Sequence, residues 1–169
     1  MEMPYGTLKL TAYNSTIYGS IGNRGEHGIS SPAGNGGKGS EGGVGCDTIK
    51  SDVLFVYGNN VVIHGGKGGT GGYGGYGGNN GKGGLGGHAV NCYQVQINGS
   101  NIALVGGEGG KGGNGGSADK ISNVGFGGLG GDGEAAVKGT IVSNKGAELS
   151  NGAIGSFGER GEVGITPIP

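Results

Sequence analysis

The sequence predicts a mainly β and irregular fold: a layered sandwich of polyglycine II helices capped by short β-strands or β-arcs, with almost no α-helix. Glycine supplies 50 of the 169 residues, much of it in Gly-Gly-X tracts such as residues 65–78. Short runs of Val, Ile and Leu with alternating polarity recur between these tracts. Their recurrence predicts about four repeats of roughly 45 residues. We expect a single glycine-rich domain over residues 1–169, with a lead at 1–6 and a tail at 165–169.

Composition narrows the alternatives to this fold. A high glycine content is also typical of disordered and collagen-like chains. Collagen needs glycine at every third position with abundant proline, whereas this chain has 4 Pro and mostly repeats Gly-Gly-X. Disordered chains are usually highly charged and poor in β-branched residues, whereas charged residues here make up only 14%. Order is therefore favoured over disorder, and with so little aromatic mass it must come from backbone hydrogen bonds.

Four segments, at residues 7–19, 53–66, 94–107 and 140–152, are expected to form the β structure. Each begins with period-2 alternation, as at Leu8 and Leu10, which is typical of a half-buried strand. A turn-rich group follows, and a second short run ends at an apolar residue. The four closing residues are Ile17, Ile63, Leu104 and Leu149, at spacings of 46, 41 and 45. Each segment therefore reads as a β-hairpin or a β-arc.

Glycine-rich arms follow each segment and return to the next one. Outward arms are expected at residues 19–28, 65–78, 106–116 and 152–164, and returning arms at 34–45, 81–87 and 125–133. Polyglycine II has three residues per turn, so Gly-Gly-X leaves two faces bare for neighbouring chains and one face carrying X. Charged X residues are expected to face solvent, and apolar ones could sit between stacked layers.

The energetics require the arms to act together. Ordering one residue costs about 1–2 kcal/mol, and glycine lies at the high end of that range. A net hydrogen bond returns only about 0.5–1.5 kcal/mol. A single arm is therefore expected to stay disordered, whereas several arms packed together and fixed at one end by β structure can become ordered.

Catalytic chemistry is not indicated, so we expect no enzyme activity, no cofactor and no metal. The dinucleotide-type glycine motifs are forced by composition and lack a surrounding βαβ unit. His27, His64 and His88 are far apart in sequence, and nothing marks a pair of catalytic carboxylates. The net charge of −1 gives no argument for nucleic acid. No apolar stretch reaches membrane-spanning length, and the start of the chain does not resemble a signal peptide.

The two cysteines invite a specific interpretation. Cys46 and Cys92 each lie 29 residues after the apolar closing residue of their repeat, because 46 − 17 and 92 − 63 are equal. If the repeats stack, the two are neighbours. They then form either a buried thiol pair or a disulfide that is favoured only after release from a reducing cytosol.

Two stretches resemble a known family. The sequences NSTIYGSIGNRG at residues 14–25 and INGSNIALVGGEGGKGGNGG at residues 97–116 are similar to the glycine-rich domain of distal tail-fibre adhesins of T-even-type bacteriophages. The likeness covers roughly residues 7–164. It implies a polyglycine II sandwich whose variable loops contact receptors on the bacterial surface. This chain departs from the family because only residues 1–6 precede the first strand, where the adhesins carry a domain that docks onto the fibre.

The resemblance implies a site and a location. Candidate receptor-binding residues lie in the loops between arms. They are Ser30, Ser31, Pro32, Asn79, Asn80, Asp119, Lys120, Ser122 and Asn123. The function it implies is a non-enzymatic virion adhesin, made in the host cytoplasm, whose partners are a bacterial outer-membrane protein or glycan and other virion proteins.

Two other functions stay open. A structural virion or surface-fibre component of the tail, fibre or capsid would use the same rod without binding a receptor. Its main partner would be another copy of the chain or a capsid or tail protein. Ice binding is a remote alternative, because springtail ice-binding proteins also use polyglycine II bundles. Those proteins present a flat face of small residues, whereas the X positions here mix Lys, Tyr, Glu and Asn.

Overall fold

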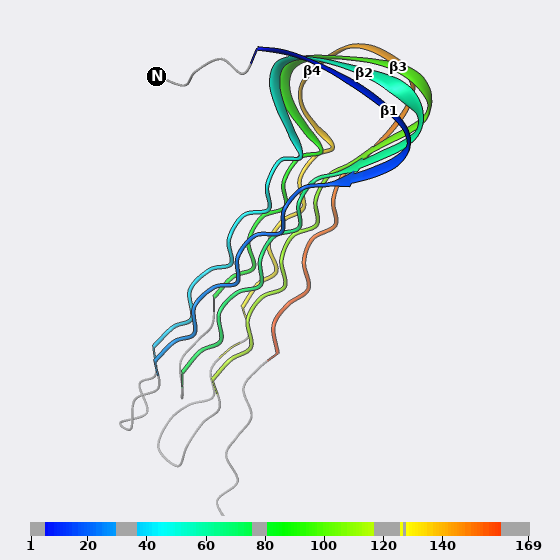
Figure 1. Cartoon of the computed structure of the whole chain (residues 1–169). Coiled ribbons are helices and arrows are strands. Elements are labelled where there is room, and N and C mark those ends of the chain that lie inside the picture. Colours follow the sequence, from blue (N-terminus) through cyan, green and yellow to red (C-terminus); the bar gives the residue numbers. More distant parts are fainter. Residues whose placement is uncertain (1–5, 30–36, 76–80, 117–125, 127, 160–169) are drawn as a thin grey trace, which may run out of the picture.

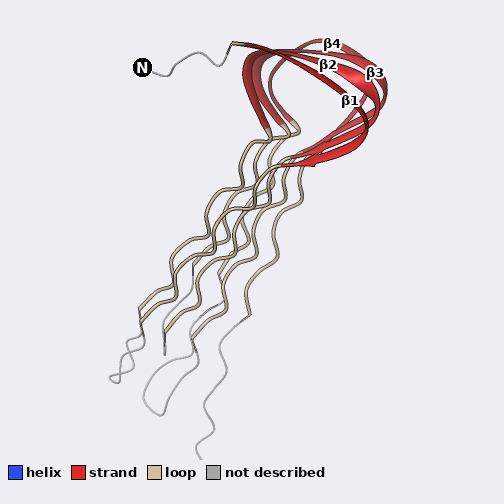
Figure 2. Cartoon of the chain, in the orientation of Figure 1, coloured by secondary structure: helices blue, strands red, loops and turns tan. Residues whose placement is uncertain are grey.

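A computed structural model describes residues 6–29, 37–75, 81–116, 126 and 128–159. The regular elements in this part of the chain are β-strands, without any helix (Figure 2). They are β1 (Thr7–Tyr18), β2 (Ile49–His64), β3 (Val90–Val105) and β4 (Val137–Ser150). The mainly β and irregular fold class is therefore confirmed. Over the same residues there is also no helix long and apolar enough to span a membrane.

The four strands form one parallel sheet in the order β1-β2-β3-β4. The apolar closing residues of neighbouring segments are paired across it, Ile17 with Ile63, Ile63 with Leu104 and Leu104 with Leu149. Apart from its last one or two residues, each expected segment lies within one continuous strand that pairs with the strands of neighbouring segments. The arc interpretation is therefore correct. The hairpin interpretation is wrong, because a hairpin would pair the two halves of one segment antiparallel to each other.

An asparagine bends each of the first three strands. Asn14, Asn60 and Asn101 have positive φ angles of 47°, 56° and 54°. Asparagine adopts this left-handed conformation more readily than most residues do. In β4 the bend contains Gly146, with φ of 87°. β2, β3 and β4 curve back on themselves, so that the chain enters and leaves each of them on the side of the arms, whereas β1 begins on the side of the sheet away from the arms (Figure 1).

The apolar core lies mainly on β2 and β3. Leu54, Val56, Val61 and Ile63 of β2 are 0% exposed, as are their partners Val95, Ile97 and Leu104 of β3, with Ile102 at 1%. Burying one such side chain contributes about 1.5–3 kcal/mol. The corresponding residues of the outer strands are less covered, for example Leu8 at 41% and Leu149 at 43%. The core is therefore open at both edges of the sheet.

In the described part of the chain, seven glycine-rich arms extend from the sheet in one direction (Figure 1). We number the outward arms one to four, at residues 19–29, 65–75, 106–116 and 151–159. We number the return arms one to three, at residues 37–48, 81–89 and 128–136. Neighbouring outward arms are joined by backbone hydrogen bonds. Examples are Gly22 N to Lys67 O at 2.8 Å, Gly68 N to Glu108 O at 2.8 Å and Gly109 N to Ala153 O at 2.9 Å.

Each return arm is hydrogen-bonded to the outward arms on both sides of it. Gly43 N donates to Asn23 O at 2.6 Å, and Gly69 N donates to Gly43 O at 2.8 Å. The pattern continues with Gly84 N to Gly69 O and Gly110 N to Gly84 O, both at 2.8 Å. Bonds of each kind recur at every third residue along an arm. We call this hydrogen-bonded set of arms the arm lattice.

The arms are too close together to admit side chains between them. A Cβ built on Gly69 would lie 1.9 Å from Asn23 O, and one on Gly84 would lie 2.0 Å from Gly43 O. The third residue of each triplet points outward instead, so that Tyr73 is 45% exposed and Leu129 is 58% exposed. The expectation that apolar X residues could sit between layers is therefore wrong, because the space between arms does not hold even one carbon atom.

Candidate functional site

The predicted receptor-binding residues fall outside the described residues. These are Ser30, Ser31, Pro32, Asn79, Asn80, Asp119, Lys120, Ser122 and Asn123. The residues that flank them are described and are tied together. Gly37 N donates to Ile29 O at 2.7 Å, and Gly128 N donates to Gly113 O at 3.0 Å. The described ends of the arms thus lie at the end of the lattice that is remote from the sheet (Figure 1).

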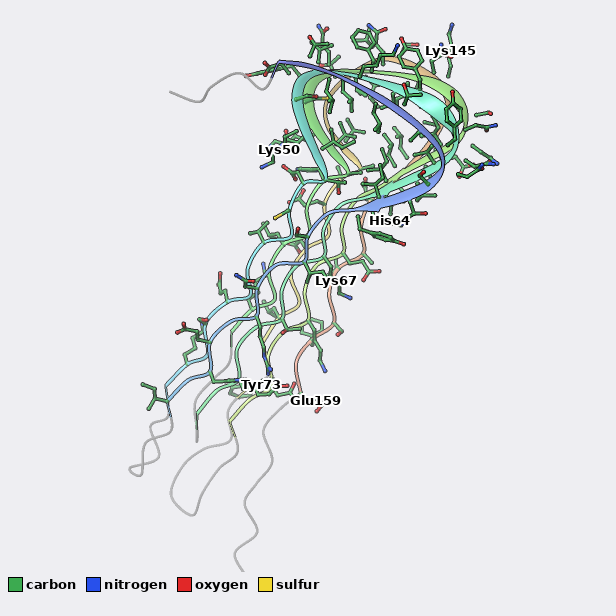
Figure 3. All side chains as sticks on the ribbon, viewed as in Figure 1. Lys50, His64, Lys67, Tyr73, Lys145 and Glu159 are labelled. Atoms are coloured by element: carbon green, nitrogen blue, oxygen red, sulfur yellow. The ribbon has the colours of Figure 1, made fainter. Side chains whose placement is uncertain are left out.

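An aromatic and basic cluster lies near that end, on the surface formed by the third residues of the outward arms. His27 and Tyr73 have ring centroids 4.8 Å apart, and Tyr73 N donates to His27 Nδ1 at 3.1 Å. The Arg24 guanidinium carbon lies 4.3 Å from the centre of the Tyr73 ring. A cation over an aromatic face is attracted by about 0.5–1 kcal/mol at an exposed site. Figure 3 shows Tyr73 and Glu159 near the ends of their arms.

Polar pairs continue this surface across the third and fourth outward arms. Asn114 Nδ2 donates to Glu159 Oε2 and Glu159 N donates to Asn114 Oδ1, both at 3.2 Å. Nearer the sheet, Lys67 Nζ lies 2.9 Å from Glu108 Oε2, with both side chains more than half exposed. Such exposed pairs contribute only about 0–1 kcal/mol to stability. The surface is therefore polar and accessible, with the chemistry to contact another molecule.

A ladder of asparagine side chains lies at the other end, along the bends of the strands. Asn101 Nδ2 donates to Asn60 Oδ1 at 2.9 Å, and Asn60 Nδ2 donates to Asn14 Oδ1 at 3.0 Å. A parallel contact runs from Ser100 Oγ to Asn59 Oδ1 at 2.6 Å. The turns predicted from the sequence include Asn14 and Asn60 but not Asn101, and the ladder itself was not predicted. Asparagine at the same position of the first three segments was the signal that could have revealed it.

The ladder does not continue into β4, because the bend of β4 is shorter than the bend of β3. Asn98 pairs with Lys145 and Ile102 with Ala147, so β4 has two residues fewer than β3 between these pairs. The shortened bend is closed by Asn144, whose Oδ1 accepts from Ala147 N at 2.9 Å. Fewer residues on one strand leave the ladder without a fourth step.

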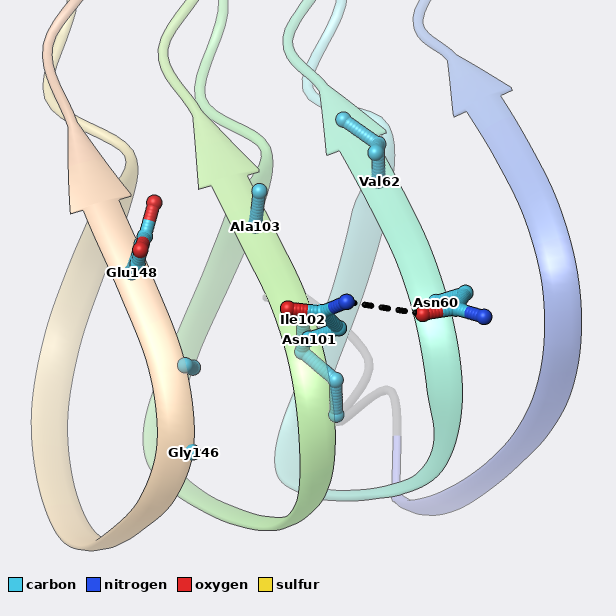
Figure 4. Close-up of a pocket in the computed structure, with 8 residues that line it drawn as sticks. Asn60, Val62, Asn101, Ile102, Ala103, Gly146 and Glu148 are labelled. Atoms are coloured by element: carbon cyan, nitrogen blue, oxygen red, sulfur yellow. Dashed lines mark hydrogen bonds between the residues drawn. The ribbon is translucent and has the colours of Figure 1, made fainter.

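A surface hollow of about 530 Å³ lies where the ladder stops. It is lined by Asn60, Val62, Asn101, Ile102, Ala103, Gly146, Ala147 and Glu148. Figure 4 shows the Asn101 amide nitrogen directed to Asn60 and its oxygen directed toward β4. The hollow therefore offers a carboxamide oxygen and the exposed carboxylate of Glu148 over small apolar side chains. It is a second polar surface, at the opposite end of the molecule from the arm ends.

A cluster of ionisable groups joins the return arms to the sheet. Asp47 accepts from His88 N at 2.8 Å and from Asn91 Nδ2 at 2.6 Å, with Lys50 Nζ at 3.5 Å. Burial would raise the pKa of Asp47, but the bonds from Asn91 and His88 and the nearby positive charge hold it below its usual value. The cluster fastens neighbouring segments to each other. No group of three or more His, Cys, Asp or Glu suited to a metal occurs among the described residues.

The cysteines do not come together. Both are free thiols, with Cys46 exposed and Cys92 buried. Cys92 is paired in register with Ser51 of β2. Cys46 lies instead against Gly87, whose added Cβ would be 2.3 Å from Cys46 O. The equal 29-residue spacing is misleading, because the connection between β1 and β2 (residues 19–48) is five residues longer than that between β2 and β3 (residues 65–89).

No protein-family model matches the chain, and no curated protein matches it. Among solved structures it is similar to the nine-polyproline-type-II-helix bundle antifreeze protein of the springtail Granisotoma rainieri, at 26% identity over 89% of this chain and 96% of that one. The TM-score of that match is 0.23.

Proposed function

We propose that this chain is a non-enzymatic bacteriophage adhesin, exposed on the virion at a tail fibre or similar surface. In this proposal the arm lattice is a layered sandwich of polyglycine II helices, built from about four repeats. The lattice holds the connections between arms toward a receptor on the bacterial surface, an outer-membrane protein or a glycan. Other virion proteins would hold the chain in the particle.

One observation carries the proposal: backbone hydrogen bonds reach the described ends of the arms. Gly75 N donates to Gly37 O at 3.0 Å, and Gly113 N donates to Gly81 O at 3.1 Å. A three-residue interval between bonds agrees with the three-residue turn of polyglycine II. A firmly bonded scaffold with chemically varied connections at one end suits recognition, because binding residues are disproportionately found on loops held by a rigid scaffold.

Binding of the purified chain to bacteria tests the proposal directly. Fluorescently labelled protein is mixed with cells of a panel of Gram-negative strains, and bound fluorescence is measured by flow cytometry. We expect saturable binding to some strains only. A variant carrying Asp119→Ser, Lys120→Ser and Asn123→Ser should lose at least about tenfold in affinity, which is about 1.4 kcal/mol. Glu148→Gln, in the hollow at the opposite end, is the matched control and should bind like the unaltered chain.

Three outcomes would argue against this reading. Stoichiometric incorporation into virions without binding to any cells would favour a structural virion component. Loss of binding with Glu148→Gln, but not with the triple variant, would move the receptor site to the hollow. Thermal hysteresis of a solution of the chain would favour ice binding.

A further inference from the structure

The outward arms differ in which triplet positions hold glycine, and the difference follows their place in the arm lattice. The second and third arms, at the centre, repeat Gly-Gly-X, as in Gly68-Gly69-Thr70 and Gly109-Gly110-Lys111. The first arm instead repeats Gly-X-X, and the fourth arm keeps glycine at only one position as well, at Gly152, Gly155 and Gly158. The two arms at the edges thus tolerate side chains where the central arms do not.

In the central outward arms, the two glycines of a triplet lie against different neighbouring arms. A Cβ on Gly68, the first glycine, would lie 2.6 Å from Gly110 N of the following outward arm and 2.0 Å from Gly84 O of the intervening return arm. A Cβ on Gly110, the second glycine, would lie 2.0 Å from Gly69 O of the preceding arm. The first glycine of a triplet therefore leaves space for the next outward arm in the numbering, and the second glycine leaves space for the preceding outward arm.

The edge arms keep only the glycine that they need. The first arm has glycine at the first triplet position, facing the second arm, but has Ser20, Asn23 and Glu26 at the second position. The fourth arm has glycine at the second position, facing the third arm, but has Asn151, Ile154 and Phe157 at the first position. Ile154 is 72% exposed and Phe157 is 70% exposed, since no described arm covers them.

We propose that these six side chains close the two edges of the arm lattice against a second copy of the chain. Without them the edges are complementary, because the fourth arm would offer N–H groups at positions 151, 154 and 157 to carbonyl oxygens of Tyr18, Ile21 and Arg24 in the next copy. That contact would repeat the bonds already formed between the first and second arms. It joins unlike edges and would therefore extend without closing, as a filament. The inference is independent of the proposed receptor binding.

A tandem chain tests the closure. Two copies are joined by a Gly/Ser linker of about 40 residues, long enough for a flexible chain to span a domain. The first copy carries Asn151→Gly, Ile154→Gly and Phe157→Gly, and the second carries Ser20→Gly, Asn23→Gly and Glu26→Gly. Joining the copies raises their effective concentration to the millimolar range. The readout is amide hydrogen exchange at positions 151, 154 and 157 of the first copy, measured by NMR.

We expect exchange at these positions to slow by about tenfold or more in the altered tandem, relative to the same variants as separate chains. The unaltered tandem is the control and should show no slowing. Unchanged exchange in a folded altered tandem would overturn the proposal, and so would slowing in the unaltered tandem, since that would mean that the edges are already open.

A second measurement covers the case in which the six-residue variant does not fold. Gly109 and Ile154 occupy the same triplet position in the third and fourth outward arms, and a Cβ on Gly109 would lie 1.9 Å from Gly131 O. Gly109→Ile should lower the urea midpoint of unfolding markedly, while Ile154→Gly should not. Equal midpoints for the two variants would overturn the proposal, because position in the lattice would then make no difference.

Discussion

Gly110 lies so close to Gly69 that a Cβ built on it would be 2.0 Å from the Gly69 carbonyl oxygen. The two residues belong to neighbouring outward arms, and Gly110 N also donates to Gly84 O at 2.8 Å. Any side chain at position 110 must therefore push backbone apart and strain the hydrogen bonds around it. Glycine is therefore required at position 110 for the arms to pack this closely.

The first prediction follows from that contact. Gly110→Ala should destabilise the protein by about 1–3 kcal/mol, the usual cost of overpacking, measured by urea denaturation. Lys111→Ala, at the outward-pointing third position, is the matched control and should change stability by less than about 0.5 kcal/mol. In a loose arm, alanine would restrict the unfolded chain and stabilise by about 0.4–1 kcal/mol. A stabilised Gly110→Ala variant would therefore contradict the packed lattice.

The second prediction concerns the asparagine ladder. Asn60→Ala removes the bonds to Asn14 and Asn101, each contributing about 0.5–1.5 kcal/mol. It also places alanine in a left-handed conformation, which costs about 1–2 kcal/mol. The expected loss is about 2–5 kcal/mol by thermal or urea unfolding. Asn60→Gly separates the two causes, because glycine accepts the backbone angle and loses only the ladder. Equal losses for the two variants would show that the backbone angle contributes nothing.

The placement of the strands and arms could be predicted from the sequence because both depend on local periodicity. Ile17, Ile63, Leu104 and Leu149 mark the same register position in four strands, and their spacing alone located them. Whether a segment forms an arc or a hairpin depends on which partner it meets. That choice is not local, so the sequence left it open.

Other features could not be predicted, because they depend on small differences in length between segments. The longer connection after β1 separates Cys46 from Cys92, and the two residues missing from β4 end the ladder beside Asn101. Each difference in length shifts the residues of one segment relative to those of its neighbour, while the residue pattern within each segment stays the same. The hollow lined by Glu148 arises from such a difference and carries no motif of its own.

The third prediction is a pH dependence from Asp47. Its folded-state pKa lies below the usual value of 3.8, so the unfolded chain takes up a proton at higher pH than the folded chain. The stabilisation by this carboxylate is complete above the unfolded pKa and is lost as pH falls through the folded pKa. Stability should therefore fall below about pH 4. In the Asp47→Asn variant the free energy of unfolding should be lower at pH 7 and should change less with pH below pH 4. Urea unfolding at a series of pH values measures both.

A control for this prediction is Asp132→Asn. Asp132 makes an exposed ion pair with Lys82, at 3.7 Å and with its side chain 65% exposed, and such pairs contribute little. As pH falls, the free energy of unfolding of the Asp132→Asn variant should decrease by the same amount as that of the unaltered chain. An Asp47→Asn variant with an unchanged acid profile would show that the bonds from His88 and Asn91 do not favour the ionised form.

The last prediction concerns the two thiols. Cys46 is exposed and Cys92 is buried, and burial raises the pKa of the Cys92 thiol, so that little of its reactive thiolate forms near neutral pH. Treatment of the folded protein with iodoacetamide at pH 8 should therefore modify Cys46 and leave Cys92 intact, as read by peptide mass spectrometry. Both should react in urea, and Cys46→Ser should leave a folded protein that takes up almost no reagent. Rapid modification of Cys92 in the folded Cys46→Ser variant would mean that the start of β3 opens readily. In that case Cys92, which is paired with Ser51 of β2, would not be part of the stable core between β2 and β3.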